Sequence, residues 1–485
     1  MSYIDDFLNN ITMYRLVLWF LIVLAVVGLI YSIVGVLPYD PIVYIFSFTF
    51  LLVAAGGANY IFAKVFEAQT NTESWIISAL ILGLIITPPK TLHEVIFVFW
   101  AAVLMVTSKF VLAPGKKHIF NPVALAVALT AVTIAGTASW WVGNASILPI
   151  MVIGGFLIVR KIRRWDMDLA FLAVSLFFIG PGRLIRSISD TPLIFFATIM
   201  LTEPLTTPPT RIWRILYGAL VGFLFAPQVH LGSIYTTPEI ALLVGNIFSY
   251  LVSPKYKLVL ELKEKIRLTP EIYDFVFIPD RQIKFTPGQY MEWTLSHEKT
   301  DARGNRRYLS LASSPTEKEI RLGVKFGSPP SSFKKRLLAL SPGQKIVAGQ
   351  LIGDFTLPKN PKKKLVFIAG GIGITPFRSM IKFLTDTKQK RDIVTIYSSK
   401  NSSDFVYQEV LREAWDRLGV KTIYVDTRTQ GHLDAERLAR EIPDYRDRTY
   451  YISGSHGVVD AFERFLRNLH IPKTQIVTDY FPGFA

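Results

Sequence analysis

A long succession of apolar segments constrains the fold of this chain more than any other feature of its sequence. Charged residues are few between residues 14 and 251, but from Lys255 onward they recur every few positions, as in a soluble protein. Residues 14–37 and 41–65 are each long enough to cross a hydrocarbon core, which takes about 20 helical residues. The pattern predicts a membrane half followed by a soluble half.

Shorter apolar segments follow these two and are bounded by Pro and Gly. Together they predict a polytopic α-helical membrane domain of about ten spans. Broken helices whose backbone groups face protein rather than lipid would explain the short segments, and so would helices that extend beyond the apolar residues. The shorter segments are residues 75–87, 95–110, 122–135, 147–159, 169–179, 192–205, 215–227 and 238–251.

Basic residues gather in alternate loops of this predicted domain. With a cytoplasmic N-terminus, the opposite loops hold little besides Lys90, Arg183 and Arg186. The positive-inside rule then predicts an integral cytoplasmic (inner) membrane protein with both termini and the soluble half in the cytoplasm. The cytoplasmic loops would carry Lys64, Lys116, Lys117, Arg160, Lys161, Arg163, Arg164, Arg211 and Arg214.

A short sequence echo indicates an internal repeat. Residues 87–91 (Thr-Pro-Pro-Lys-Thr) close the third predicted span, and residues 206–210 (Thr-Thr-Pro-Pro-Thr) close the eighth. A repeat with an odd number of spans must insert upside down relative to its twin. The echo predicts an inverted 5+5 repeat, unless the proline pairs simply end two unrelated helices.

The residue types limit the cofactors. The chain has no cysteine, which excludes disulfides and cysteine-bound zinc or iron–sulfur clusters. His93, His118 and His230 lie near loop ends and do not form the paired ligands of a transmembrane haem. The net charge of +16 is spread over both halves, so the bilayer is the expected partner and nucleic acid is not. Redox work would use organic cofactors and no metal.

The soluble half begins like an antiparallel barrel. Residues 258–262 and 272–278 alternate apolar and polar side chains, as strands of such a barrel do. Further on, Arg307 can supply a cation for a pyrophosphate, and Ser310 a hydroxyl for the redox-active nitrogen of a flavin. The alternative is a basic strand edge without a ligand.

A glycine turn follows an apolar strand later in the soluble half. Residues 365–369 are apolar, residues 370–376 read Gly-Gly-Ile-Gly-Ile-Thr-Pro, and a helical pattern follows from residue 377. Gly371 and Gly373 would let a pyrophosphate approach the backbone, and the helix N-terminus would supply N–H donors. This order predicts a doubly wound α/β nucleotide domain, although a glycine turn can also be purely structural.

These segments together resemble the ferredoxin–NADP reductase family. Residues 307–310 (Arg-Tyr-Leu-Ser) are similar to its Arg-x-Tyr-Ser motif, in which Arg binds the FAD pyrophosphate, the aromatic ring stacks on the flavin and Ser bonds near N5. Leu309 takes the aromatic position in register, and Tyr308 takes it if the register slips by one. Ser331 and Ser332 resemble the family's second pyrophosphate segment, which is compatible with a plain helix cap.

The same resemblance covers the nucleotide domain. Thr375 and Pro376 match the family's Gly-x-Gly-x-x-Pro nicotinamide loop. Ser453 stands before Gly454 where the family usually has Cys-Gly beside the nicotinamide. Phe481 is the candidate for a terminal aromatic ring over the flavin.

The end of the second nucleotide-domain strand bears on the choice of nucleotide. Lys400 follows this strand, and no acid that would bind a ribose 2′-hydroxyl stands there. The basic residue and the missing acid favour NADPH over NADH. Asp404 and Glu409 lie near enough in sequence to keep NADH open.

Two segments of the membrane half resemble the membrane subunits B and D of the Nqr and Rnf electron-transport complexes. They are residues 118–122 (His-Ile-Phe-Asn-Pro) and 202–210 (Thr-Glu-Pro-Leu-Thr-Thr-Pro-Pro-Thr). The resemblance implies ten spans and a flavin. The family's flavinylated Thr lies in Ser-Gly-Ala-Thr, which this chain lacks, so a non-covalent FMN or riboflavin is expected. Its candidate ligands are Asn121, Thr206, Thr207 and Thr210.

Three domains are predicted: residues 1–254 in the membrane, residues 255–360 binding FAD, and residues 361–485 binding NAD(P)H. The chain would move a hydride from NAD(P)H to FAD beside Ser310 and Ser453, and pass single electrons into or across the membrane through a second flavin. The acceptor would be an extracytoplasmic flavoprotein or a quinone. The alternatives are a quinone reductase on the cytoplasmic face and a transporter with a fused regulatory reductase.

Overall fold

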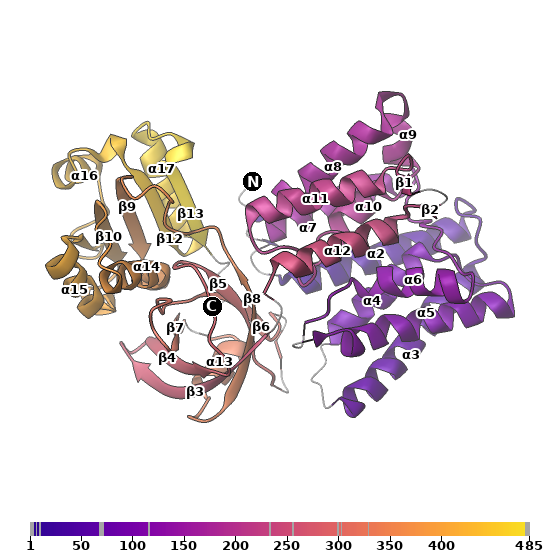
Figure 1. The fold of residues 1–485 in the computed structure, drawn as a ribbon, viewed down its shortest axis with the longest axis horizontal. Helices are drawn as coiled ribbons and strands as arrows, with labels where there is room; N and C mark the ends of the chain where they lie inside the picture. The colour runs from indigo at the N-terminus through magenta and orange to yellow at the C-terminus, as the bar shows by residue number, and fades with distance from the viewer. Residues whose placement is uncertain are drawn as a thin grey trace. The chain divides into compact units, whose positions relative to one another are not determined.

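The computed structural model describes residues 4–5, 7–8, 11–66, 72–114, 117–231, 234–254, 257–297, 300–301, 303–327 and 329–480. The chain divides into two compact units, Met1–Tyr256 and Lys257–Ala485. Figure 1 draws the first in indigo to magenta and the second in the colours that run on to yellow. The boundary predicted at residue 360, inside the second unit, stays a prediction.

The N-terminal unit is built from helices, several of which begin at well-formed caps. Asp40 accepts hydrogen bonds from the N–H groups of Ile42 and Val43 at the start of α3, and Thr91 forms a capping box with Glu94 at the start of α5. The helices are α2 (Met13–Ile33), α3 (Pro41–Val65), α4 (Thr72–Ile85), α5 (Leu92–Val111), α6 (Pro122–Thr133), α7 (Leu148–Ile162), α8 (Trp165–Ile179), α9 (Leu184–Ser189), α10 (Leu193–Phe195) with a π-helical continuation (Phe196–Met200), α11 (Arg211–Phe225) and α12 (Pro238–Val252).

The expected number of about ten spans is wrong. Among the described residues, three helices, α2, α3 and α5, are long and apolar enough to cross a membrane by length and composition. Several other apolar segments end their helices early and continue as irregular backbone. After α6, for example, the N–H groups of Ser139 and Trp140 both donate to the carbonyl of Ile85, at 2.9 Å, just where α4 ends. That stretch satisfies the end of α4 instead of extending α6.

The helices of this unit pack in an order that recurs. α3 packs on α5 as α8 packs on α11, and α5 packs on α6 as α11 packs on α12. α2 contacts α4, and α7 correspondingly contacts α10 and its continuation; α2 also contacts α7, and α6 contacts α12. The two groups of helices therefore use one packing order.

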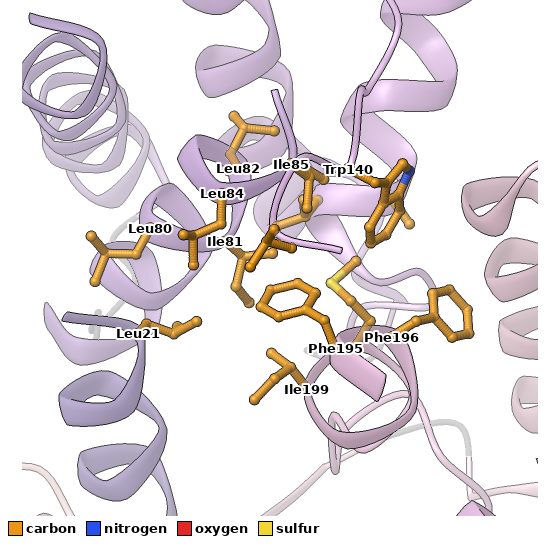
Figure 2. Close-up of a cluster of buried hydrophobic side chains, with 14 of the residues drawn as sticks. Leu21, Leu80, Ile81, Leu82, Leu84, Ile85, Trp140, Phe195, Phe196 and Ile199 are labelled. Carbon is orange, nitrogen blue, oxygen red and sulfur yellow. The ribbon is translucent and has the colours of Figure 1, made fainter. Parts of the chain in front are cut away.

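Glycines and aromatic rings fill the centre of this unit. A Cβ at Gly218 or Gly222 of α11 would lie 2.3 Å from the Met167 carbonyl or 2.5 Å from the Phe171 carbonyl of α8, so these helices meet backbone to backbone. The Trp140 ring lies 6.0 Å from the Phe196 ring. Figure 2 shows these rings with Phe195 beside the aliphatic side chains of α4.

The second unit begins with an antiparallel sheet of six strands in the order β6-β5-β8-β3-β4-β7. The predicted antiparallel strands are therefore confirmed. A short helix, α13 (Ser332–Leu338), lies between β7 and β8 in the chain. The strands are β3 (Leu258–Arg267), β4 (Ile272–Pro279), β5 (Tyr290–Thr294), β6 (Arg306–Ser310), β7 (Ile320–Lys325) and β8 (Lys345–Ile352).

A parallel sheet of five strands follows in the order β11-β10-β9-β12-β13. Its central strand β9 is buried along its whole length, as expected for a parallel sheet covered by helices. The winding reverses between β9 and β12, which makes their carboxyl ends the switch point where α/β folds bind ligands. The elements are β9 (Leu365–Gly370), α14 (Thr375–Asp386), β10 (Ile393–Ser399), α15 (Gln408–Leu418), β11 (Lys421–Asp426), α16 (Ala435–Glu441), β12 (Thr449–Gly454), α17 (His456–Asn468) and β13 (Ile476–Tyr480).

Candidate functional site

Arg307 occupies a buried position on β6, opposite Trp293 of β5. Its Nη1 donates hydrogen bonds to the carbonyls of Arg303, at 2.7 Å, and Gly304, at 3.2 Å. The pKa of the Arg307 guanidinium is lowered to about 10, chiefly by burial; the charge of Asp301 opposes this change and the charge of Arg303 adds to it. Burial thus disfavours the charged form of the Arg307 guanidinium, and the charge of an incoming anion would favour it.

Lys334 adds a further cation near Arg307, and the sequence alone did not indicate it. Burial lowers the pKa of Lys334 to about 8, assisted by the charges of Arg307 and Arg303. Its Nζ donates to the carbonyl of Lys325 at 2.8 Å. We call Arg303, Arg307 and Lys334 the cation cluster. Their repulsion would be relieved by the two negative charges of a pyrophosphate.

Asp301 lies within the cation cluster and was also missed. Its Oδ2 accepts from the Ser332 N–H at 2.8 Å and from Arg303 Nη2 at 2.9 Å. Burial alone would raise the pKa of Asp301, but these donors outweigh burial and lower it to about 2. Ser331 and Ser332 are occupied as well, because Ser331 Oγ caps Lys334 N–H and Ser332 Oγ accepts from Asp301 N–H. The helix-cap interpretation thus describes Ser331, whereas Ser332, the first residue of α13, binds Asp301 instead.

Tyr308 and Leu309 lie on opposite faces of β6, since side chains alternate along a strand. The Tyr308 hydroxyl lies 3.0 Å from both Glu292 Oε2 and Gln350 Oε1. Leu309 shares the face of Arg307 and is half-buried. The geometry therefore favours the register in which Leu309 faces the flavin and Tyr308 anchors the sheet.

The segment after Ser310 is hydrogen-bonded to α14, the helix that follows β9. Ser310 is itself buried at the end of β6. Two residues beyond it, the Ala312 carbonyl accepts from Arg378 Nη1 at 2.7 Å, and the Ser313 carbonyl accepts from Ser379 Oγ at 2.6 Å. Arg378 and Ser379 lie on α14, the helix that begins right after the glycine turn. The candidate flavin strand and the candidate nicotinamide loop are thus held together.

A buried ion pair reinforces this junction. Arg378 forms a two-point contact with Glu317, with Nη1 2.7 Å from Oε2 and Nη2 3.0 Å from Oε1. The Arg378 guanidinium also lies 5.4 Å from the centroid of the Tyr407 ring. A Cβ at Gly323 of β7 would approach the hydroxyl of Tyr407, the N-cap residue of α15, to 2.5 Å, so β7 and the start of α15 pack closely there.

The glycine turn forms the predicted link between β9 and α14. Gly371 has φ +54°, a conformation that favours glycine, and a Cβ there would meet no atom within 4 Å, which leaves open space beside the backbone. A Cβ at Gly373 would lie 2.3 Å from the Ser453 carbonyl, so the turn rests on Ser453 and Gly454 at the end of β12. Pro376 stands in the first turn of α14. Backbone and helix N-terminus are therefore placed for a pyrophosphate.

The strand ends beside the turn carry exposed cations and engaged acids. Lys400 follows β10 and is exposed, as is Arg428 after β11, which sequence reasoning missed. Asp404 Oδ2 lies 3.3 Å from Lys325 Nζ, and Asp426 Oδ1 accepts from the Arg428 N–H at 3.0 Å. Thr375 Oγ1 donates to the Ile372 carbonyl within the turn. Phe481 lies outside the described residues.

The membrane-half candidates meet around Glu203. Asn121 Nδ2 donates to Glu203 Oε2 at 3.0 Å, Thr206 Oγ1 donates to the same oxygen at 3.2 Å, and His118 Nε2 lies 3.3 Å from Oε1. We call these four residues the Glu203 cluster. Thr207 bonds instead to the Pro204 carbonyl, and Thr210 stands at the N-cap of α11 without a side-chain cap bond. Of the four predicted flavin ligands, Asn121 and Thr206 therefore belong to the Glu203 cluster, whereas Thr207 and Thr210 do not.

Comparisons with known proteins address the second unit. Residues 367–462 match the family model of the oxidoreductase NAD-binding domain. An NADPH oxidoreductase of Mycobacterium tuberculosis is 30% identical over 186 residues, which are 37% of this chain and 48% of that protein. The flavohemoprotein of Bacillus subtilis is 29% identical over 223 residues, 43% of this chain and 55% of that protein. The chain spans about half the length of the curated relatives it matches.

Among solved structures, the flavohem-like FAD/NAD-binding domain of nitric oxide dioxygenase from Vibrio cholerae aligns with a TM-score of 0.42 and 20% identity, over 46% of this chain and 98% of that one. The C-terminal half is therefore similar to ferredoxin–NADP reductase-like FAD/NAD-binding modules, and the sequence matches support the predicted class, an NAD(P)H-dependent FAD oxidoreductase. The resemblance of the membrane half stays a prediction.

Proposed function

We propose that this chain is a membrane flavoprotein that takes a hydride from NAD(P)H onto FAD and passes single electrons into or across the membrane through a second flavin. One observation carries the proposal: α14, which follows the glycine turn, is hydrogen-bonded to the segment that follows Ser310. This arrangement keeps the nicotinamide loop beside the flavin strand. A hydride can move directly only when donor and acceptor are held in such near-contact geometry.

FAD, when bound, supplies the chemistry that accepts a hydride and releases electrons one at a time. The residues of this chain would bind and orient FAD and the nicotinamide. The cation cluster would hold the pyrophosphate. Ser310 would donate a hydrogen bond to the flavin, and Leu309 would cover its ring. Ser453 would stand on the nicotinamide side without the thiol that the ferredoxin–NADP reductase family usually has there.

NADPH is the nucleotide that the strand ends favour. Lys400 and Arg428 are exposed cations at neighbouring strand ends, β10 and β11. Asp404 and Asp426, the acids near them, are engaged by Lys325 and by backbone N–H groups. A 2′-phosphate would thus meet positive charge, while a 2′-hydroxyl would find no free carboxylate among these residues.

The membrane half would carry electrons onward. The recurring helix packing supports an inverted repeat, and the Glu203 cluster offers a polar site for a non-covalent FMN or riboflavin among apolar helices. In this proposal both termini and the reductase module are cytoplasmic. Electrons leave to an extracytoplasmic flavoprotein or to a quinone.

Flavin content separates the parts of this proposal. Purified full-length protein should release two flavins per chain on denaturation and oxidise NADPH with ferricyanide as acceptor. One flavin per chain would exclude transmembrane transfer through a second flavin and leave a quinone reductase on the cytoplasmic face. Absence of NAD(P)H oxidation in intact, FAD-loaded protein would favour a transporter whose reductase module only regulates it.

A further inference from the structure

Exposed lysines gather at the edge of the parallel sheet opposite the nucleotide site. Lys359, Lys362 and Lys363 precede β9, while Lys388 and Lys390 precede β10. β9 and β10 are parallel neighbours that pair from Leu365 and Ile393 onward, so the loops before them begin at the same edge. We call these five residues the lysine surface.

Hydrogen bonds make the two loops a single surface. Arg391 Nη1 of the second loop donates to the Pro358 carbonyl of the first at 2.8 Å. The Leu365 N–H donates to the Asp392 carbonyl at 2.9 Å. The lysines therefore project from tied loops and not from two independent tails.

The charge of the lysine surface is not neutralised within the part of the chain that the structure describes, where no ion pair joins these five residues to an acid. The acids along this edge already pair with other cations: Asp386 with Lys382, Asp392 with Arg448, and Asp444 with Lys364 and Arg448. Positive charge is consequently concentrated in front of β9 and β10.

Neither cofactor explains this concentration. Nucleotides bind at the carboxyl ends of such strands, and the lysine surface lies at the amino ends. Residues 358–364 and 386–392 contain no aromatic side chain on which a nucleic-acid base could stack. Lysine ammonium groups are mobile point charges, which suit a field of phosphates that has no fixed geometry.

We propose that the lysine surface binds anionic phospholipid headgroups and holds the nucleotide-binding sheet at the bilayer surface. The inference rests on the membrane placement proposed above. Residues 253–257 alone separate α12 from β3, so the chain itself keeps the reductase close to any bilayer that the helices enter. Clusters of about four to eight basic residues are what anionic leaflets attract.

Full-length protein in lipid nanodiscs provides the test. One set of nanodiscs contains phosphatidylcholine alone, and the other contains added phosphatidylglycerol. A lysine-acylating reagent followed by mass spectrometry reads each lysine. Labelling of the lysine surface should be at least about five-fold slower with phosphatidylglycerol, and high salt should remove the difference. Lys284 and Lys318, exposed lysines of the antiparallel sheet unit, should label equally in both.

Variants sharpen the result. The triple change Lys362→Gln, Lys363→Gln and Lys388→Gln should expose Lys359 and Lys390 to labelling in both lipids, whereas the matched change of Lys284 and Lys318 to Gln should leave the protection intact. Equal labelling of the wild-type chain in both lipids, or protection that appears only with an added acidic protein, would overturn the inference. Failure to insert into nanodiscs despite NADPH oxidation would overturn the membrane placement and this inference with it.

Discussion

The guanidinium carbon of Arg307 lies 5.2 Å from the centroid of the Phe333 ring. Phe333 is fully buried at the start of α13, so the ring fixes one face of the guanidinium while carbonyl oxygens hold Nη1. This contact presents Arg307 as a positioned charge on β6.

Replacing Arg307 by Ala should weaken FAD binding by about ten- to a hundred-fold, because a hydrogen bond to a charged group contributes about 1.5–3 kcal/mol. Titration of FAD-free protein, followed by flavin fluorescence, measures the change. Lys335→Ala, an exposed lysine on α13, is the matched control and should bind FAD normally. Equal affinity of Arg307→Ala and Lys335→Ala would remove Arg307 from the site.

FAD affinity should fall above pH 8. Lys334 has a pKa lowered to about 8 without ligand, and a bound pyrophosphate favours its charged form. Binding above pH 8 must therefore take up a proton, and affinity should drop by up to about ten-fold between pH 8 and pH 9. Lys334→Gln should bind more weakly at pH 7 and lose this step. A flat profile for the wild-type chain would contradict the assignment.

The lowered pKa of Lys334 should also make the FAD-free fold more stable as the pH rises above 8. Unfolded lysine titrates near about 10.4, so between pH 8 and that value the unfolded chain holds more protons than the folded chain. Stability from Lys334 then rises with pH across this window, because folding no longer has to keep a buried charge. Urea unfolding at pH 7.5 and pH 9.5, compared between wild type and Lys334→Gln, isolates the contribution; a wild-type gain no larger than the variant's would count against it.

Much of this site follows from local sequence, and the remainder depends on contacts that sequence does not display. Arg307, Ser310 and the glycine turn are local patterns on predicted strands and turns. Asp301 and Lys334 reach the cation cluster from segments on either side of β6 and β7, so neither is recognisable before the fold is known. The role of Tyr308 is decided by Glu292 and Gln350 on neighbouring strands.

The membrane half shows a different limit. Apolar composition indicates burial in lipid or protein but does not fix where a helix ends. Trp140 illustrates this, because it lies in irregular backbone after α6, where its N–H donates to the end of α4 and its indole donates to Glu239 of α12 at 2.7 Å. Asn121 and Thr206, two of the predicted ligands, both contact Glu203, an acid to which the sequence alone assigns no role.

Nucleotide choice should depend on Lys400 and Arg428. Changing both to Ala should lower kcat/KM for NADPH by about ten-fold or more, because charge-assisted hydrogen bonds to phosphate are lost. The value for NADH should hardly change, since NADH carries no 2′-phosphate. Steady-state rates with ferricyanide measure both. Lys318→Ala, an exposed lysine away from the strand ends, serves as the control, and a parallel loss with both nucleotides would refute the specificity.

The Glu317–Arg378 pair should control both stability and hydride transfer. Arg378→Met leaves the partly buried Glu317 with only the longer contact to Arg321, at 3.6 Å, which should lower the free energy of unfolding by about 3 kcal/mol, whereas Lys318→Ala beside it should cost less than about 0.5 kcal/mol. Burial alone would raise the pKa of Glu317, but Arg378, with the Ser314 N–H and Arg321, outweighs burial and lowers it. A carboxyl group with a lowered pKa stabilises the fold above its unfolded pKa of about 4.3, so this contribution should be lost as pH falls below that value.

Because Arg378 also holds the Ala312 carbonyl, stopped-flow reduction of bound FAD by NADPH should slow in Arg378→Met even where the protein remains folded. Normal reduction rates in a destabilised variant would show that the pair maintains the fold without positioning the nicotinamide loop.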